Sequence, residues 1–338
     1  MLKKYAYKKL MSLGLTSAFT LGLLANAANA ELIDELREPY IESFKGKTVA
    51  FLPMAMGFNL TEGWGAAMQA AAEKHGFEFV IRDPNWNTNA GTQALTALIT
   101  EKPDIIVVHN PDVQSYARLL QKAEKAGINV IQVNMKSSYS TNVYVGADWV
   151  EIGEAGAEEM VKRCGEGSGT SGKVAIIQGP LTGAASVYEI KGVMNVLDQH
   201  KEIKIVANQA ADWDASKAKA ITQTVLQQHP DLCAVFGFWD VMTLGVAAAV
   251  KEAGKTGEVA VLTNGGGHQM ACDNVKSGAF DKVWSYDVPG QSRDLVSMIK
   301  MIFQSNAKPG DMRIALYSPL KEISMEAFDP SICWSLEK

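Results

Sequence analysis

The feature that most constrains the fold is a regular alternation of short apolar runs with amphipathic stretches, which begins at Thr48. Short apolar runs bounded by turn residues are typical of buried strands, whereas the longer stretches carry apolar residues at helical spacing. The expected strands of the first half are residues 49–54, 77–82, 105–109, 130–134 and 143–146, and the expected helices are 62–74, 90–100, 113–126 and 150–163. This series predicts an α/β protein with a parallel sheet covered by helices on both faces.

The same alternation restarts after residues 165–172, a segment of Gly, Ser and Thr with one Glu that we expect to be a loop. The expected strands of the second half are residues 174–178, 203–208, 234–238, 259–263 and 282–286, and the last long helix is expected over 292–304. A chain of 338 residues exceeds the roughly 250 to 300 residues that one hydrophobic core serves. The second series therefore predicts a second lobe.

An internal sequence similarity indicates that the two lobes are alike. The segment Lys102–Asp112 resembles His229–Asp240, and each is followed by a helix ending in Ala-Gly and by a strand that ends near an Asn, at Asn134 and Asn264. We therefore expect two similar doubly wound parallel-sheet lobes. Ligands of open parallel sheets bind beyond the carboxyl ends of the strands, so two such sheets facing each other would form a cleft between those ends.

The first thirty residues have the pattern of a secretory signal peptide. Four lysines precede an apolar stretch over residues 10–24, and Ala28-Asn29-Ala30 is a cleavage site of the small-x-small type. The alternative is an N-terminal membrane anchor, but the apolar stretch is shorter than the roughly 20 residues that span a bilayer. We expect residues 1–30 to be removed and the protein to lie in a bacterial periplasm.

Export would place the four cysteines, all of which follow residue 163, in an oxidising compartment. Cys164, Cys233, Cys272 and Cys333 allow three pairings, among which the sequence does not choose. A bond between Cys164 and Cys233, which stand at the starts of two expected strands, and a buried free thiol at Cys233 are equally compatible with the pattern.

Aromatic and polar side chains gather where the expected strands end. Five of the seven tryptophans follow strands: Trp64, Trp86, Trp149, Trp213 and Trp239. Interleaved with them are the polar residues Asn59, Asn85, Asn110, Asn134, Asp148, Asp240, Asn264 and Asp287. Aromatic faces match the C–H face of a sugar ring, and these polar groups can pair with ring hydroxyls. The alternative is that Trp64 and Trp86 belong to the core and that the Asn and Asp side chains cap helices.

Other function classes lack their signatures. The formal net charge of −5 disfavours nucleic acid as a partner, and neither a dinucleotide-binding glycine motif nor a P-loop is present. The Gly265–His268 run is a weak candidate for an anion cradle. The five histidines have no partners at metal-site or catalytic-triad spacing, and so we expect no metal, no cofactor and no enzymatic activity.

The order of several segments resembles the periplasmic sugar-binding proteins of ABC importers, specifically the ribose-binding branch. These segments are residues 49–52, 102–112, 144–148, 172–179, 211–214 and 229–236. The resemblance implies a type I periplasmic binding protein fold, with two lobes joined by three crossings near residues 145–148, 286–287 and 316–321. The corresponding boundaries are residues 31–147 with 287–320 for the N-terminal lobe and 148–286 with 321–338 for the C-terminal lobe.

The resemblance also implies ligand contacts at Phe58, Asn59 or Thr61, Asn85, Asn134, Asp148, Trp213, Trp239, Asn264 and Tyr286 or Asp287. The strand-end pattern adds Trp64, Trp149 and Asp240 to the candidate site. The chain departs from the family where an Asp-Arg pair is replaced by Asn134-Met135, and where a second Arg is replaced by Val187 or Tyr188. An Asn of the family is replaced by Trp239. Without these two arginines, the pocket lacks guanidinium groups that would donate charge-assisted hydrogen bonds to ring hydroxyls. This predicts a flatter, more aromatic pocket, suited to a polyol, a deoxy sugar or a neutral ring compound.

These observations predict a monomeric solute-binding component of an ABC importer, which closes on a sugar or polyol like a hinge and delivers it to the permease. The alternative is a periplasmic receptor for a non-sugar ring compound, such as a nucleoside or a signal molecule, that serves sensing or chemotaxis. Repressors of similar fold carry a helix-turn-helix where this chain has the expected signal peptide, and an α/β enzyme would need a catalytic constellation that the sequence lacks.

Overall fold

The computed structural model describes residues 34–336, so the expected signal peptide lies outside the described residues. The chain divides into a short unit that ends at Glu42 and a large unit from Ser43 onward. The short unit contains helix α2 (Arg37–Glu42). Within residues 34–336, no helix is both long enough and apolar enough to cross a membrane.

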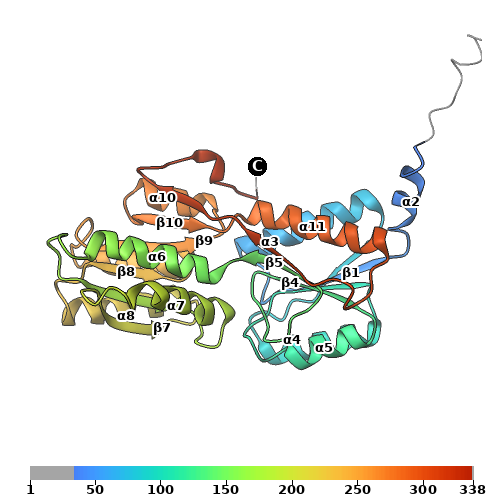
Figure 1. Cartoon of the computed structure of the whole chain (residues 1–338), viewed down its shortest axis with the longest axis horizontal. Helices are drawn as coiled ribbons and strands as arrows, with labels where there is room; N and C mark the ends of the chain where they lie inside the picture. The colour runs from blue at the N-terminus through green and yellow to red at the C-terminus, as the bar shows by residue number, and fades with distance from the viewer. Residues whose placement is uncertain (1–33, 337–338) are drawn as a thin grey trace, which may run out of the picture. The chain divides into compact units, whose positions relative to one another are not determined.

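The first sheet of the large unit has six strands in the order β11-β5-β4-β3-β1-β2, all paired in parallel. Its strands are β1 (Thr48–Leu52), β2 (Glu78–Ile81), β3 (Ile105–Val108), β4 (Asn129–Val133), β5 (Val143–Ala147) and β11 (Ile314–Ser318). Its helices are α3 (Asn59–His75), α4 (Thr88–Glu101), α5 (Ala117–Lys125) and α11 (Val288–Ser305). Helices α4 and α5 cover one face and α3 and α11 the other (Figure 1), so the central strands are buried on both sides.

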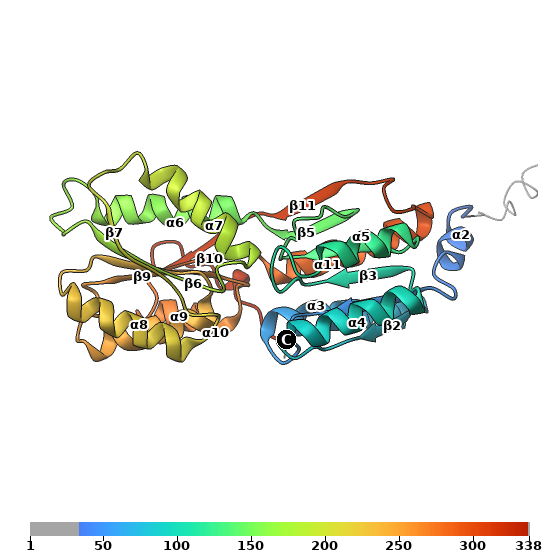
Figure 2. The same ribbon diagram turned by 90° about the horizontal axis from the view of Figure 1, so that it is seen from below.

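The second sheet has the order β12-β10-β9-β8-β6-β7, with only the edge strand β12 antiparallel among the described strands. Its strands are β6 (Lys173–Gln178), β7 (Lys204–Ala210), β8 (Ala234–Gly237), β9 (Ala260–Gly265), β10 (Lys282–Ser285) and β12 (Lys321–Ser324). Its helices are α6 (Trp149–Cys164), α7 (Ala184–Leu197), α8 (Ala215–Gln228), α9 (Asp240–Glu252) and α10 (Gln269–Lys276). A short 3-10 helix, η1 (Pro330–Ile332), follows β12. Helices α6 and α7 lie on one face, and α8, α9 and α10 on the other (Figure 2).

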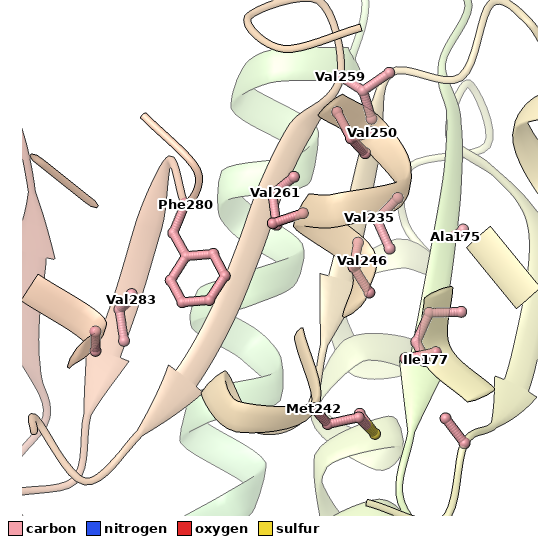
Figure 3. Packing of buried hydrophobic residues seen from close by; sticks show 14 of the residues in the cluster. Ala175, Ile177, Val235, Met242, Val246, Val250, Val259, Val261, Phe280 and Val283 are labelled. Carbon is pink, nitrogen blue, oxygen red and sulfur yellow. The ribbon is translucent and has the colours of Figure 1, made fainter. Parts of the chain in front are cut away.

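β-Branched side chains make up much of the core between the second sheet and α9. Val235 of β8 and Val261 of β9 meet Val246 and Val250 of the helix, with Phe280 beside them (Figure 3). Burying such a side chain stabilises the fold by about 1.5–3 kcal/mol relative to exposure. The predicted fold class, two parallel-sheet α/β lobes, is confirmed.

The chain passes three times from one sheet to the other. It does so between β5 and α6, between β10 and α11, and between β11 and β12. Three thin connections leave few contacts to fix the angle between two sheets, which is the arrangement of hinged binding proteins. The precise limits of the two lobes stay a prediction.

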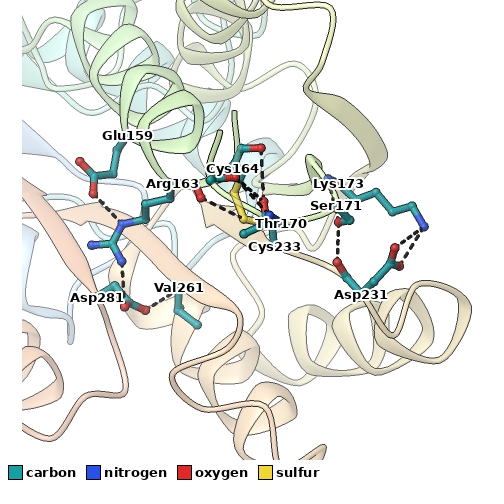
Figure 4. The surroundings of a disulfide bond; sticks show 11 residues. Glu159, Arg163, Cys164, Thr170, Ser171, Lys173, Asp231, Cys233, Val261 and Asp281 are labelled. Carbon is teal, nitrogen blue, oxygen red and sulfur yellow. Dashed lines mark hydrogen bonds and ion pairs between the residues drawn. A yellow bond between two sulfur atoms is a disulfide. The ribbon is translucent and has the colours of Figure 1, made fainter. Parts of the chain in front are cut away.

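The structure shows how the four cysteines pair, which the sequence did not decide. Cys164 at the end of α6 is bonded to Cys233 just before β8 (Figure 4). Cys272 of α10 is bonded to Cys333. Cys233 is therefore not a free thiol. The bonds link residues 69 and 61 positions apart, and in the chain-entropy estimate each restricts the unfolded chain enough to stabilise the fold by about 4 kcal/mol.

Most of the strands and helices with expected bounds begin and end within two residues of them. Helix α3 begins at Asn59, three residues before the expected start, and two larger differences are informative. Helix α5 begins at Ala117 and not at Val113, because the Asp112 carboxylate accepts hydrogen bonds from the backbone of Gln114 and Ser115 and holds a turn there. Helix α11 begins at Val288, four residues before the expected start, with Pro289 in its first turn. Proline is favourable there, because its missing N–H has no partner in a helical first turn.

Candidate ligand-binding site

A cavity lies where the carboxyl ends of strands from both sheets meet, and its space of about 360 Å³ includes the part that is open to solvent. It is lined by Met54, Phe58, Leu60, Trp86, His109, Asn134, Met135, Trp149, Ala185, Trp213, Phe238, Trp239 and Tyr286. A mainly apolar and aromatic lining with a few polar groups is typical of small-molecule sites. Among the described residues, no Lys, Arg, Asp or Glu contributes to this lining.

Four aromatic rings form a continuous series along the cavity, from the first lobe to the second. Phe58 stacks on Trp86 with ring centroids 5.1 Å apart, and it meets Trp239 edge-on at 5.8 Å. Trp239 in turn meets Trp213 edge-on at 6.0 Å. Phe58 precedes α3, and Trp239 precedes α9, so a ring contact joins the ends of two strands from different sheets.

Two of these tryptophans stand on strained turns at matching places in the two lobes. Asn85-Trp86 follows β2 with φ values of 49° and 63°, and Asp212-Trp213 follows β7 with φ values of 54° and 64°. A positive φ is a genuine outlier for a bulky residue and costs of order 1–3 kcal/mol, which surrounding structure must offset. Such strain is concentrated at ligand-binding positions.

Trp213 also depends on a glycine. A Cβ atom placed on Gly179, just after β6, would lie 2.2 Å from the Trp213 ring, so the indole packs directly against the backbone there. Any larger residue at Gly179 would push this ring out of place.

Asn134 is held by the segment that joins the lobes and not left free for a ligand. Its carbonyl oxygen accepts hydrogen bonds from the Trp149 indole at 2.7 Å and from the Tyr144 hydroxyl at 2.9 Å. Its side-chain Oδ1 accepts from the Ala147 backbone and from the Gln291 amide, at 3.3 and 3.4 Å. Its φ of 57° is one that Asn tolerates.

Two nitrogens of the lining have unused hydrogen-bonding capacity. His109 is 3% exposed and meets Trp64 edge-on at 5.2 Å, and desolvation lowers its pKa to about 3, so the ring is neutral at pH 7. Within the described part of the chain, His109 Nδ1 and Trp213 Nε1 are buried without a hydrogen-bond partner. Buried polar groups are normally paired, so both are candidates for ligand contacts.

A buried polar cluster of Glu189, Asn264, Asp240 and Tyr286 extends the second-lobe side of the site. The Asn264 amide donates to Glu189 Oε1 at 2.7 Å, and burial raises the pKa of Glu189 well above its usual range, which keeps that acid protonated. Burial also raises the pKa of Asp240 to about 7, although its carboxylate accepts the Val241 N–H at 2.8 Å. Desolvation thus favours the neutral form of both buried acids.

The model of the periplasmic binding protein domain family matches residues 49–307, most of the chain. The chain belongs to this family. Its two parallel-sheet lobes have the type I periplasmic binding protein fold. Family membership agrees with the prediction that the protein binds a solute and is not an enzyme.

Curated relatives share part of the sequence. The ribose import binding protein of Bacillus subtilis is 27% identical over 56% of this chain and 60% of its own length. The D-allose-binding periplasmic protein of Escherichia coli is 33% identical over 43% of this chain and 48% of its own length. The chain therefore spans about half to three fifths of these two relatives.

A solved structure supports the fold over a longer span. An ABC transporter solute-binding protein from Agrobacterium vitis, bound with α-D-tagatopyranose, superposes with a TM-score of 0.72 at 23% identity. The superposition covers 85% of this chain and 97% of that protein.

Six of the predicted site residues of this binding protein line the cavity: Phe58, Asn134, Trp149, Trp213, Trp239 and Tyr286. Eight lie outside the lining: Asn59, Thr61, Trp64, Asn85, Asp148, Asp240, Asn264 and Asp287. Ligand contact by any of the fourteen stays a prediction.

Several residues outside the lining have local structural roles. Asp148 caps α6 by accepting the N–H groups of Val150 and Glu151, and Asp287 pairs with Lys321 at 2.7 Å. Trp64 is fully buried and donates to Gln291 Oε1 at 3.1 Å. Within the described residues, no group of three or more His, Cys, Asp or Glu side chains could hold a metal ion.

The prediction omitted some lining residues. Trp86 follows a strand like the other tryptophans, so the same rule could have placed it in the site. His109 directly follows β3, yet a single histidine without partners at a recognisable spacing gives no signal in the sequence. Met54, Leu60, Ala185 and Phe238 resemble ordinary core residues.

Proposed function

We propose that the protein is the periplasmic solute-binding component of an ABC importer, which captures a small neutral sugar or polyol in the interlobe cavity and delivers it to the permease. The observation that carries this proposal is a cavity lined from both lobes by aromatic rings and by no charged side chain among the described residues. Uncharged walls disfavour ionic ligands, because a buried charge without a partner is costly. The relatives that bind ribose and D-allose support the ligand class.

Capture works through the hinge. The described conformation has direct contacts between the lobes: the Phe58 and Trp239 rings, and a hydrogen bond of 3.1 Å from the Val113 N–H to the Thr182 carbonyl. A ligand that touches both walls adds contacts that exist only when the lobes are together, so it favours the closed form. The permease would then recognise the closed form.

The proposal includes a monomeric protein in the periplasm that needs no cofactor. Two disulfides support an oxidising compartment, because such bonds persist in secreted and periplasmic proteins. The expected signal peptide supports the same location.

A second candidate is a receptor for a non-sugar ring compound that serves sensing or chemotaxis. The aromatic lining favours it, since indole faces stack on any neutral ring. Both candidates require binding in the same cavity, so the ligand decides between them.

A thermal-shift screen of the purified protein against sugars, polyols and nucleosides tests the proposal. A specific ligand at a hundred times its Kd should add about 2.7 kcal/mol to the free energy of unfolding. A shift with nucleosides alone would favour the second candidate. No shift with any of the three classes would contradict the proposed function.

A further inference from the structure

We infer that the ligand is a deoxygenated ring, namely a sugar or polyol in which hydrogen or methyl groups replace several of the hydroxyls. This inference rests on the proposed function, because it concerns the same cavity. It comes from the balance of hydrogen-bond donors and acceptors on the walls.

Almost half of the lining carries no hydrogen-bonding side chain. These residues are Met54, Phe58, Leu60, Met135, Ala185 and Phe238. The remaining side chains are those of four tryptophans, His109, Asn134 and Tyr286. A wall of this composition suits carbon-bound hydrogens more than hydroxyls.

The polar side chains near the hinge are already paired with protein. The Trp149 indole donates to the Asn134 carbonyl, and Asn134 Oδ1 accepts two hydrogen bonds. The Tyr286 hydroxyl has a side-chain hydrogen bond with Asn134. At this end of the cavity the Trp149 indole and the Asn134 oxygens are engaged by protein and are not free for a ligand.

The side chains that remain are mostly donors. An indole N–H donates and cannot accept, so Trp213 can pair with an ether, carbonyl or hydroxyl oxygen but not with a hydroxyl proton. Neutral His109 offers one acceptor nitrogen. Every hydroxyl of a ligand brings a proton that needs an acceptor, and among the lining side chains of the described chain His109 is the one that offers an acceptor nitrogen.

An unpaired amide acceptor and an unpaired carboxyl group lie behind the wall and not on it. Glu189 Oε2 and Asn264 Oδ1 are buried without a partner in the described chain, and neither residue belongs to the lining. A fully hydroxylated sugar would need the wall to rearrange to reach them. A hydroxyl left unpaired in the cavity weakens binding by about tenfold.

The strained tryptophans strengthen the inference. Trp86 and Trp213 stand on turns of positive φ, and Phe58 and Trp239 join them in one series of rings. The fold thus holds a broad apolar surface against the ligand at a conformational cost. Such a surface binds a ring face that carries hydrogen or methyl substituents more tightly than one that carries hydroxyls.

Calorimetry with matched pairs of compounds tests the inference. The pairs are L-fucose and L-galactose, L-rhamnose and L-mannose, 2-deoxy-D-ribose and D-ribose, and 1,2-cyclohexanediol and myo-inositol. We expect the less hydroxylated member to bind at least about tenfold more tightly in each pair that binds. Tighter binding of the more hydroxylated members would overturn this inference and leave the proposed function intact, whereas no binding by any compound would contradict both.

Two variants separate the role of the acceptor from general damage. His109→Leu removes the free acceptor and should weaken binding of the preferred compound about tenfold, while the matched His200→Leu, on an exposed residue outside the lining, should leave its Kd unchanged. Trp213→Phe keeps a ring but removes the donor, so affinity should fall for both members of a pair while their ratio persists. An unchanged Kd in both cavity variants would overturn the inference.

Discussion

Trp239 is the residue whose removal should affect binding most. It lies between Phe58 of the first lobe and Trp213 of the second, so it belongs to the only ring contact between the lobes in this described series. A ligand stacked on one face of an indole covers roughly a third of its surface, about 80 Å². At about 25 cal/mol per Å² this contributes about 2 kcal/mol, and the aromatic contact adds about 1 kcal/mol. We therefore expect Trp239→Ala to raise the Kd by about a hundredfold.

The assay is calorimetry on the best-binding compound, combined with thermal melting of the same samples. Trp284→Ala is the matched control, because Trp284 is 6% exposed on β10, packs against Phe236 and lies outside the cavity. The control should lose about 3–5 kcal/mol of stability and keep its ligand affinity once folded. If Trp239→Ala instead bound like the parent and melted far lower, Trp239 would be a core residue and the reasoning would be refuted.

Three more predictions concern groups outside the cavity. Trp334 touches Gly63 of α3 in the first lobe and donates its indole N–H to the Gly266 carbonyl of the second lobe at 2.8 Å. Trp334→Ala should therefore let the two lobes open more easily and raise the Kd several-fold. An unchanged ligand dissociation rate in stopped flow would contradict this. Because the pKa of Asp240 is raised to about 7, its charged form opposes folding, and stability should fall from about pH 4 to pH 7. Asp240→Asn should remove that slope, up to about 1.4 kcal/mol per pH unit, in urea titrations; an identical slope would exclude the assignment. Replacing Cys272 and Cys333 by Ser should cost about 4 kcal/mol in the same titrations, and a loss below 1 kcal/mol would show that the closed loop matters little.

Much of the fold was predictable because buried parallel strands leave a strong local signal. The runs at residues 105–108 and 234–237 are apolar throughout and bounded by turn residues, and both are fully buried strands. The start of α5 was not predictable, because a hydrogen bond that the Asp112 carboxylate accepts from the Gln114 N–H decides it. The disulfide pairs depend on Cα distances of 6.0 and 6.1 Å, which arise only after the strands have assembled.

The lining of the candidate site was predictable to within a few positions, but the direction of the side chains was not. The rule that ligands lie beyond strand ends led to Trp239 and to Asp240, yet only Trp239 lines the cavity while Asp240 begins α9 and is buried. Neighbouring residues at a strand end point in different directions, and packing with the other lobe decides which one faces the cavity. Asn134 does line the cavity, but its side-chain oxygen is engaged by Ala147 and Gln291, which the sequence did not indicate.

The central claim is that a neutral ligand holds the two lobes together. Small-angle scattering of the purified protein, with and without a saturating amount of the best-binding compound, tests it most directly. A ligand that bridges Phe58 and Trp239 should favour the closed form and lower the radius of gyration, and the Trp239→Ala variant should need a correspondingly higher concentration for the same change. A radius of gyration that is the same at zero and at saturating ligand, while calorimetry reports binding, would contradict the claim.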